Sequence, residues 1–232
     1  MSIHEKIQEY YSGMADEHHR YRSWEHCYRY FHGLTAETAV LNRETAALHL
    51  GFYLASWGMY RGSSFLLQRG YTAHYGVIEK IFQPQFSSLW TREFGAADND
   101  TDLIPIILEA VEVIRDAYRP VAGSREATDT LVTKVVLGTF GSLPACDRYF
   151  ISGFKKAGFS CSALNTRFVT KLLAFTREHR RELLEEQRTI ERIGGIKYPF
   201  MKLVDMYFWQ IGAGISEQKQ NSDLELVAQG ER

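Results

Sequence analysis

The chain has 232 residues with 27 basic and 28 acidic side chains, a formal net charge of −1 and 45% hydrophobic residues. This balance is typical of a globular protein and excludes both a disordered chain and one that attracts nucleic acid through overall positive charge. Three cysteines without a C-x-x-C pair exclude a zinc or iron–sulfur site made from cysteine alone. No apolar run is long enough to span a membrane and no signal peptide is visible, so we expect a cytoplasmic protein without a membrane partner.

Helical periodicity dominates the chain, and neither an alternating strand pattern nor an internal repeat is present. Glycine and proline breaks are expected at 58–62 and 120–124, and residues 83–102 are polar and irregular. The sequence therefore predicts an all-α domain over residues 1–216, followed by a polar C-terminal tail at 217–232. The expected helices cover residues 3–20, 21–33, 35 to 53 or 57, 64–69, 75–82, 104–118, 127–139, 147–157, 163–191 and 198–212.

The stretch 130–150 places one carboxylate at a conspicuous position. An apolar helix is followed by a short connection containing glycine and proline, and Asp147 then stands at the head of the next helix. An aspartate there accepts hydrogen bonds from free backbone N–H groups and caps the helix. It can equally serve as a fixed carboxylate for chemistry, so the local pattern leaves both interpretations open.

The segment 130–158 resembles the helix-hairpin-helix DNA glycosylases of the endonuclease III type. In that family an apolar helix ends in Phe-Gly, here Phe140-Gly141. A turn with proline follows, and an aspartate opens a helix that ends in a basic pair and a glycine, here Gly158. The family's aspartate is catalytic, so the resemblance implies that role for Asp147. It also implies two helical lobes with a cleft, double-stranded DNA as partner, and no cofactor or metal.

Two differences from the family narrow the expected activity. The family's hairpin usually reads Leu-Pro-Gly-Val-Gly, whereas residues 123–129 contain a single glycine. The nucleophilic lysine of bifunctional members would fall near Thr130 or Leu131, and Lys134 lies about one turn beyond. The resemblance therefore implies a monofunctional enzyme that releases a base by hydrolysis. We expect the target to be a modified or damaged base, and defence against phages with modified DNA is one such role.

The turn between two early helices supplies candidates for the base pocket, namely Ser56, Trp57, Tyr60 and Arg61. Aromatic rings there could sandwich a flipped base and the arginine could hold a phosphate or a base edge. The alternative is a packed helical corner with Trp57 in the core. The candidates for DNA contact are Thr128, Thr130, Lys134, Arg148, Lys155 and Lys156.

Several other features favour structure over function. Residues 163–191 carry mixed charges, typical of a solvated helix face or, alternatively, of a basic stripe facing a ligand. Pro199 and Gly212 bracket a helix in which Asp205 and Trp209 could form a buried hydrogen-bonded pair. The eight histidines show no metal-binding spacing. The alternative function is a non-catalytic helical module that binds DNA or a protein, in which Asp147 only caps its helix. No pattern indicates an oligomeric state.

Overall fold

The computed structural model describes residues 2–97, 99–160 and 163–230, with side chains described through residue 218. Within these ranges the chain is helical and contains no strand, which confirms the all-α prediction. The α-helices are α1 (Ile3–Ser12), α2 (Arg22–His32), α3 (Ala36–Leu41), α4 (Arg43–Ser56), α5 (Tyr75–Ile81), α6 (Ser87–Thr91), α7 (Leu103–Ala122), α8 (Asp129–Gly138), α9 (Arg148–Lys156), α10 (Thr166–Glu178), α11 (Arg180–Gly194) and α12 (Phe200–Gly230). Short 3-10 helices lie at Gly13–Ala15, Phe65–Gln68, Tyr71–His74, Pro84–Phe86 and Asp100–Asp102.

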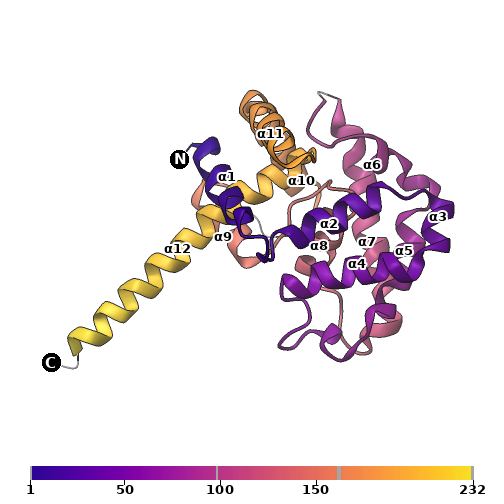
Figure 1. Cartoon of the computed structure of the whole chain (residues 1–232), viewed down its shortest axis with the longest axis horizontal. Coiled ribbons are helices and arrows are strands. Elements are labelled where there is room, and N and C mark those ends of the chain that lie inside the picture. Colours follow the sequence, from indigo (N-terminus) through magenta and orange to yellow (C-terminus); the bar gives the residue numbers. More distant parts are fainter. Residues whose placement is uncertain (1, 98, 161–162, 231–232) are drawn as a thin grey trace.

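The helices form two groups that lie side by side (Figure 1). One group contains α2 to α8, in which α2 packs on α4 and α5 packs on α7. The other contains α1 together with α9 to α12, and both α1 and α9 pack along α12. The second group is thus built from both ends of the sequence, and α10 joins it to the first through contacts with α7.

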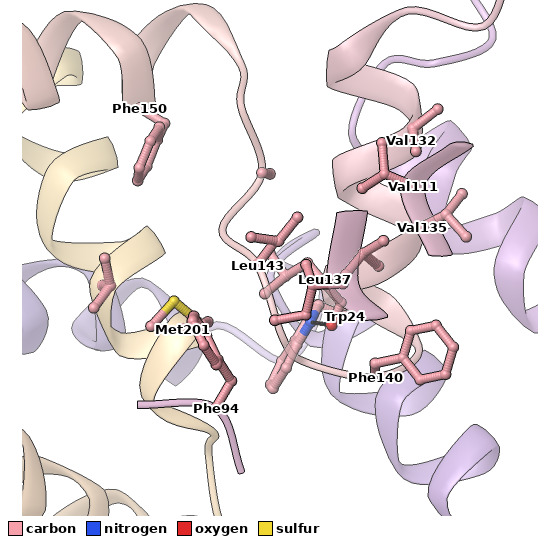
Figure 2. Packing of buried hydrophobic residues seen from close by; sticks show 14 of the residues in the cluster. Trp24, Phe94, Val111, Val132, Val135, Leu137, Phe140, Leu143, Phe150 and Met201 are labelled. Atoms are coloured by element: carbon pink, nitrogen blue, oxygen red, sulfur yellow. Dashed lines mark hydrogen bonds between the residues drawn. The ribbon is translucent and has the colours of Figure 1, made fainter. Parts of the chain in front are cut away.

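The connection from α8 to α9 runs through the interior between the two groups. Its residues 139–145 are all buried, and Leu143 lies near Leu137 and Trp24 (Figure 2). The indole Nε1 of Trp24 donates to the carbonyl of Leu137 at 3.0 Å, which ties α2 to the end of α8. At Gly141, which has φ of +69°, a Cβ would stand 2.6 Å from Cγ of Pro199. The connection is therefore fixed by packing on both sides.

Several expected helices have different bounds. The helix expected from residue 35 is divided at Asn42, and the one expected over 163–191 is divided at His179, because both residues leave helical geometry at φ near −105° and −107°. The break expected at Pro120 is wrong, since α7 includes this residue in its last turn, where its missing N–H removes one hydrogen bond only. The helix expected over 3–20 ends at Ser12, and the stretch 83–102 contains α6.

The expected helix end at Gly212 is also wrong, because α12 continues to Gly230. The tail expected from residue 217 is therefore helical through 230, and its last two residues lie outside the described part of the chain. A Cβ on Gly212 would stand 1.9 Å from the carbonyl oxygen of Tyr149, and a Cβ on Gly153 would stand 1.9 Å from that of Phe208. These two glycines let the backbones of α9 and α12 come into contact, and Gly212 serves this approach instead of a helix stop.

Candidate functional site

Asp147 is held by three donors. It is the N-cap of α9, where its Oδ1 accepts the backbone N–H groups of Tyr149 at 3.0 Å and Phe150 at 3.1 Å. Its Oδ2 lies 3.2 Å from Nζ of Lys134, and only 15% of its side chain is exposed. Asp147 thus caps α9 with one oxygen, and its second oxygen faces a buried cation.

Lys134 occupies a different place from the one expected of a phosphate contact. Its side chain is 2% exposed, and its ammonium group lies between Asp147 and the ring of Trp57, whose centroid is 4.9 Å away. A buried ammonium group is stable only when paired and hydrogen-bonded. Lys134 is thus an internal partner of the carboxylate, and a phosphate would have to enter the interior to meet it.

A second buried ion pair lies on α12. Nζ of Lys202 is 3.0 Å from Oδ2 of Asp205 and donates to the hydroxyl of Tyr10 at 3.1 Å, while Oδ1 of Asp205 accepts the backbone N–H of Ala145 at 3.0 Å. Burial lowers the pKa of Lys202 and raises the pKa of Asp205, so both shifts favour the neutral forms. Asp205 thereby fixes the backbone two residues before Asp147.

The hydrogen-bonded pair that Asp205 and Trp209 could have formed is absent among the described residues. Both residues are buried, but Nε1 of Trp209 has no hydrogen-bond partner among the described residues. Asp205 is engaged by Lys202 and a backbone amide instead. The spacing of residues 202, 205 and 209 places all three on one face of α12, a signal that could have indicated a shared site.

Trp57 stands at the centre of an aromatic and cationic enclosure. Its ring is stacked on Tyr21 with centroids 5.5 Å apart, and meets Trp209 edge-on at 6.1 Å. The guanidinium carbon of Arg20 lies 4.9 Å from its ring centroid, and Nζ of Lys202 lies at 5.8 Å. Nothing in the local sequence around Trp57 indicated Arg20 or Tyr21, because these two residues lie far away in the sequence, directly before α2.

A cavity of about 10 Å³ remains inside this enclosure, with room for about one water molecule. Its lining combines two lysines, two aspartates and three large aromatic residues. The lining residues are Tyr53, Trp57, Lys134, Leu137, Ala145, Asp147, Lys202, Asp205 and Trp209. The interior is thus nearly filled, and its two cations are matched by two anions.

A larger hollow of about 510 Å³ is lined by the residues that directly follow Trp57, from Gly58 onward. It lies between the turn 58–65 and residues 125–131, so the structure brings together Arg61, Thr128 and Thr130. Arg61 is exposed, as expected from the glycines at 58 and 62 that flank it with positive φ. Thr128 caps α8 and Thr130 donates to the carbonyl of Cys146, while Arg125, which the sequence did not single out, also lines the hollow.

Ser56 and Tyr60 are not brought into either hollow. The Ser56 hydroxyl donates to the carbonyl of Phe52 one turn earlier in α4. The Tyr60 hydroxyl lies 2.7 Å from Nε2 of His74, whose Nδ1 is 2.8 Å from the hydroxyl of Tyr118. Both side chains are therefore engaged outside the lining of the two hollows.

The remaining candidates for DNA contact lie on α9. Arg148 is exposed, stacks on the ring of Tyr149 at 4.5 Å and donates to its hydroxyl. Lys155 and Lys156 are exposed in the last turn of the same helix. The three cations are accessible to a polyanion, and none lines the two hollows beside Trp57.

A separate hollow of about 480 Å³ lies beside the end of α2, away from Asp147, and is lined in part by Tyr28, Trp90 and Phe140. Two of its cations are already paired. Arg92 binds Asp100 and Asp102, and Lys197 binds Glu93. The concentration of buried charge lies at Trp57, and we assign the candidate site there.

Among the described residues, no three histidine, cysteine, aspartate or glutamate side chains gather as a metal site would require; Cys161 lies outside them. No described helix combines the length and apolar character needed to cross a membrane. The chain matches no protein-family model, and no significant match exists among curated proteins or solved structures.

Proposed function

We propose that this protein is a monofunctional DNA glycosylase of the helix-hairpin-helix type, which hydrolyses the N-glycosidic bond of a flipped, modified or damaged base. One observation carries the proposal. The carboxylate of Asp147 caps α9 with one oxygen and turns the other into an enclosure of aromatic rings and charges beside Trp57. The ammonium group of Lys134 holds this second oxygen on the side of the enclosure.

The chemistry requires a fixed negative charge in a site with little water. The bond from C1′ to the base nitrogen breaks with its electron pair leaving on the base, so positive charge develops on the sugar. Asp147 would stabilise that charge and take a proton from the water whose oxygen bonds to C1′. Low local dielectric makes the charge more effective than it would be in bulk water.

The surface around the site suits a polyanion. Arg61 and Arg125 line the outer hollow, and the exposed Arg20 lies over the ring of Trp57. Cations placed this way attract phosphates locally, although the chain as a whole carries no positive net charge. Double-stranded DNA is therefore the proposed partner.

The test is incubation of the purified protein with duplexes that carry a panel of modified and damaged bases, including hypermodified phage DNA. Alkali cleavage would report abasic sites. We expect Asp147→Asn to slow base release by about 100-fold or more, because one preorganised charge is worth that much. The matched control is Asp129→Asn, an exposed aspartate in the first turn of α8 that pairs with Arg115. Base release that survives Asp147→Asn would refute the role, and an adduct trapped by borohydride would refute the monofunctional assignment.

A non-catalytic DNA reader is the second candidate, and one observation favours it. Both oxygens of Asp147 already have partners, and the cavity beside them holds about 10 Å³. Fluorescence polarisation with labelled duplexes separates the two functions. DNA binding without base release from any duplex supports a reader, and the absence of binding supports a protein-interaction module.

A further inference from the structure

Two hollows of very different size lie near Trp57. The outer one, of about 510 Å³, begins at Gly58, the next residue along the chain, and is bordered by Thr130. The inner one, of about 10 Å³, is bordered by Trp57 itself and by Lys134, which lies one helical turn after Thr130 in α8. The indole therefore lies in the wall of the charged interior, and the residues directly after Trp57 line the outer hollow.

The indole of Trp57 is held by its ring faces and not by its polar atom. Its Nε1 is buried and has no hydrogen-bond partner among the described residues. The indoles of Trp24 and Trp90, by contrast, donate to the carbonyls of Leu137 and Ile81, both at 3.0 Å. A buried N–H without a partner destabilises the folded state. Trp57 thus occupies a place whose polar surroundings do not complement an indole.

The surroundings of Trp57 do complement a planar ring that carries several donors and acceptors. Tyr21 lies parallel to its plane at 8°, and Trp209 closes one edge. Lys134 and Asp147 line the interior together with the pair on α12 formed by residues 202 and 205. Stacking surfaces with donors and acceptors at the rim are what a nucleobase needs in a binding pocket.

The geometry points to Trp57 as a movable stopper that fills a binding slot for a purine or pyrimidine ring and swings out when the ring enters. Trp57 comes directly after the last residue of α4, and its N–H still donates to the carbonyl of Tyr53. Gly58 follows with φ of +76°, so the chain leaves helical geometry directly after Trp57. Its departure would enlarge the inner hollow by the volume of the indole. The inference rests on the proposed function for the source of the ring, a flipped base of DNA, while the slot itself is testable without DNA.

The slot is tested with Trp57→Ala and free ligands, namely indole, cytosine and adenine, by isothermal titration calorimetry. Removal of the stopper should strengthen binding by about tenfold or more, because the wild-type protein binds only in the fraction of molecules with the slot open. The matched control is Trp90→Ala, which removes an indole packed between Phe82 and Phe140. The control should not gain affinity for the two bases. A folded Trp57→Ala protein that binds none of the three ligands more tightly than wild type overturns the inference.

A second measurement uses the wild-type chain, in case the alanine variant does not fold. With 5-fluorotryptophan incorporated, the fluorine resonance of Trp57, assigned with Trp57→Phe, should shift on addition of cytosine or adenine, and that of Trp24 should not. A spectrum unchanged by both bases overturns the inference.

These outcomes also distinguish the base-binding slot from the proposed glycosylase activity. If Trp57→Ala binds free bases but no duplex releases a base, the base-binding slot is supported and the glycosylase activity is refuted. If DNA releases a base but wild type and Trp57→Ala bind free bases with equal affinity, the glycosylase activity is supported and the role of Trp57 as a stopper is refuted.

Discussion

Lys134 and Asp147 join α8 to α9 through a buried ion pair, with Nζ 3.2 Å from Oδ2. The pair orients the carboxylate from inside the protein, while the backbone of α9 orients it from the other side. Lys202 and Asp205 form a second pair in the lining of the same cavity, so charges of both signs are matched there.

Asp147→Asn should destabilise the protein by about 3 kcal/mol, because it leaves the ammonium group of Lys134 buried without its counter-ion. The capping interaction is not the cause, since asparagine caps a helix as well as aspartate does. The double variant Asp147→Asn with Lys134→Met should recover most of this loss, as measured by urea unfolding. Equal stability of the single and double variants would contradict the pairing, and the double variant should still lack base release.

Gly212→Ala should destabilise the fold by about 3 kcal/mol or more, because its Cβ would stand 1.9 Å from the backbone oxygen of Tyr149, which cannot move aside as a side chain could. Gly214→Ala, two residues further in α12, is the control. Its Cβ meets nothing within 4 Å, so alanine should be neutral or stabilise the helix by about 1 kcal/mol. Thermal unfolding of both variants checks the prediction, and equal melting temperatures would refute the close helix crossing.

The free energy of unfolding should depend on pH through His74. Burial lowers its pKa from 6.5 to about 4, and its ring lies between the hydroxyls of Tyr60 and Tyr118. Between these two pH values the unfolded chain binds a proton that the folded chain does not, so stability falls as pH falls from 6.5 to 4, by about 3 kcal/mol in total. Urea unfolding of wild type and His74→Gln at several pH values measures this difference. If the difference in stability between wild type and His74→Gln stays constant over that pH range, the prediction is wrong.

Arg61→Ala should weaken binding to duplex DNA and reduce the salt dependence of the affinity by about one unit of slope, as expected for the loss of one phosphate contact. Arg61 is exposed at the mouth of the outer hollow. Arg181→Ala is the control, because that side chain is 93% exposed on α11 and pairs only locally with Glu185. Equal salt slopes for wild type and Arg61→Ala would exclude this contact.

The sequence predicted the helical class and the position of Asp147 at a helix start, because periodicity and capping are local properties. It failed at Gly212, since a glycine that ends a helix and one that admits a second backbone have the same local pattern. It placed Lys134 on an outer surface for a related reason. Whether a lysine is buried depends on the partner that faces it, and Asp147 reaches it only once the connection of residues 139–147 is folded.

The hydrogen bond from Lys202 to the hydroxyl of Tyr10 joins residues 192 positions apart. During synthesis on the ribosome, Tyr10 emerges before Lys202, which follows the helices from α2 to α11. A nascent chain that stops before α12 would hold Lys134 and Asp147 but would lack the second pair and the edge of Trp209 against Trp57. Closure of the charged interior therefore has to wait until α12 has been synthesised, and a chain without α12 would leave Trp57 without one of its walls.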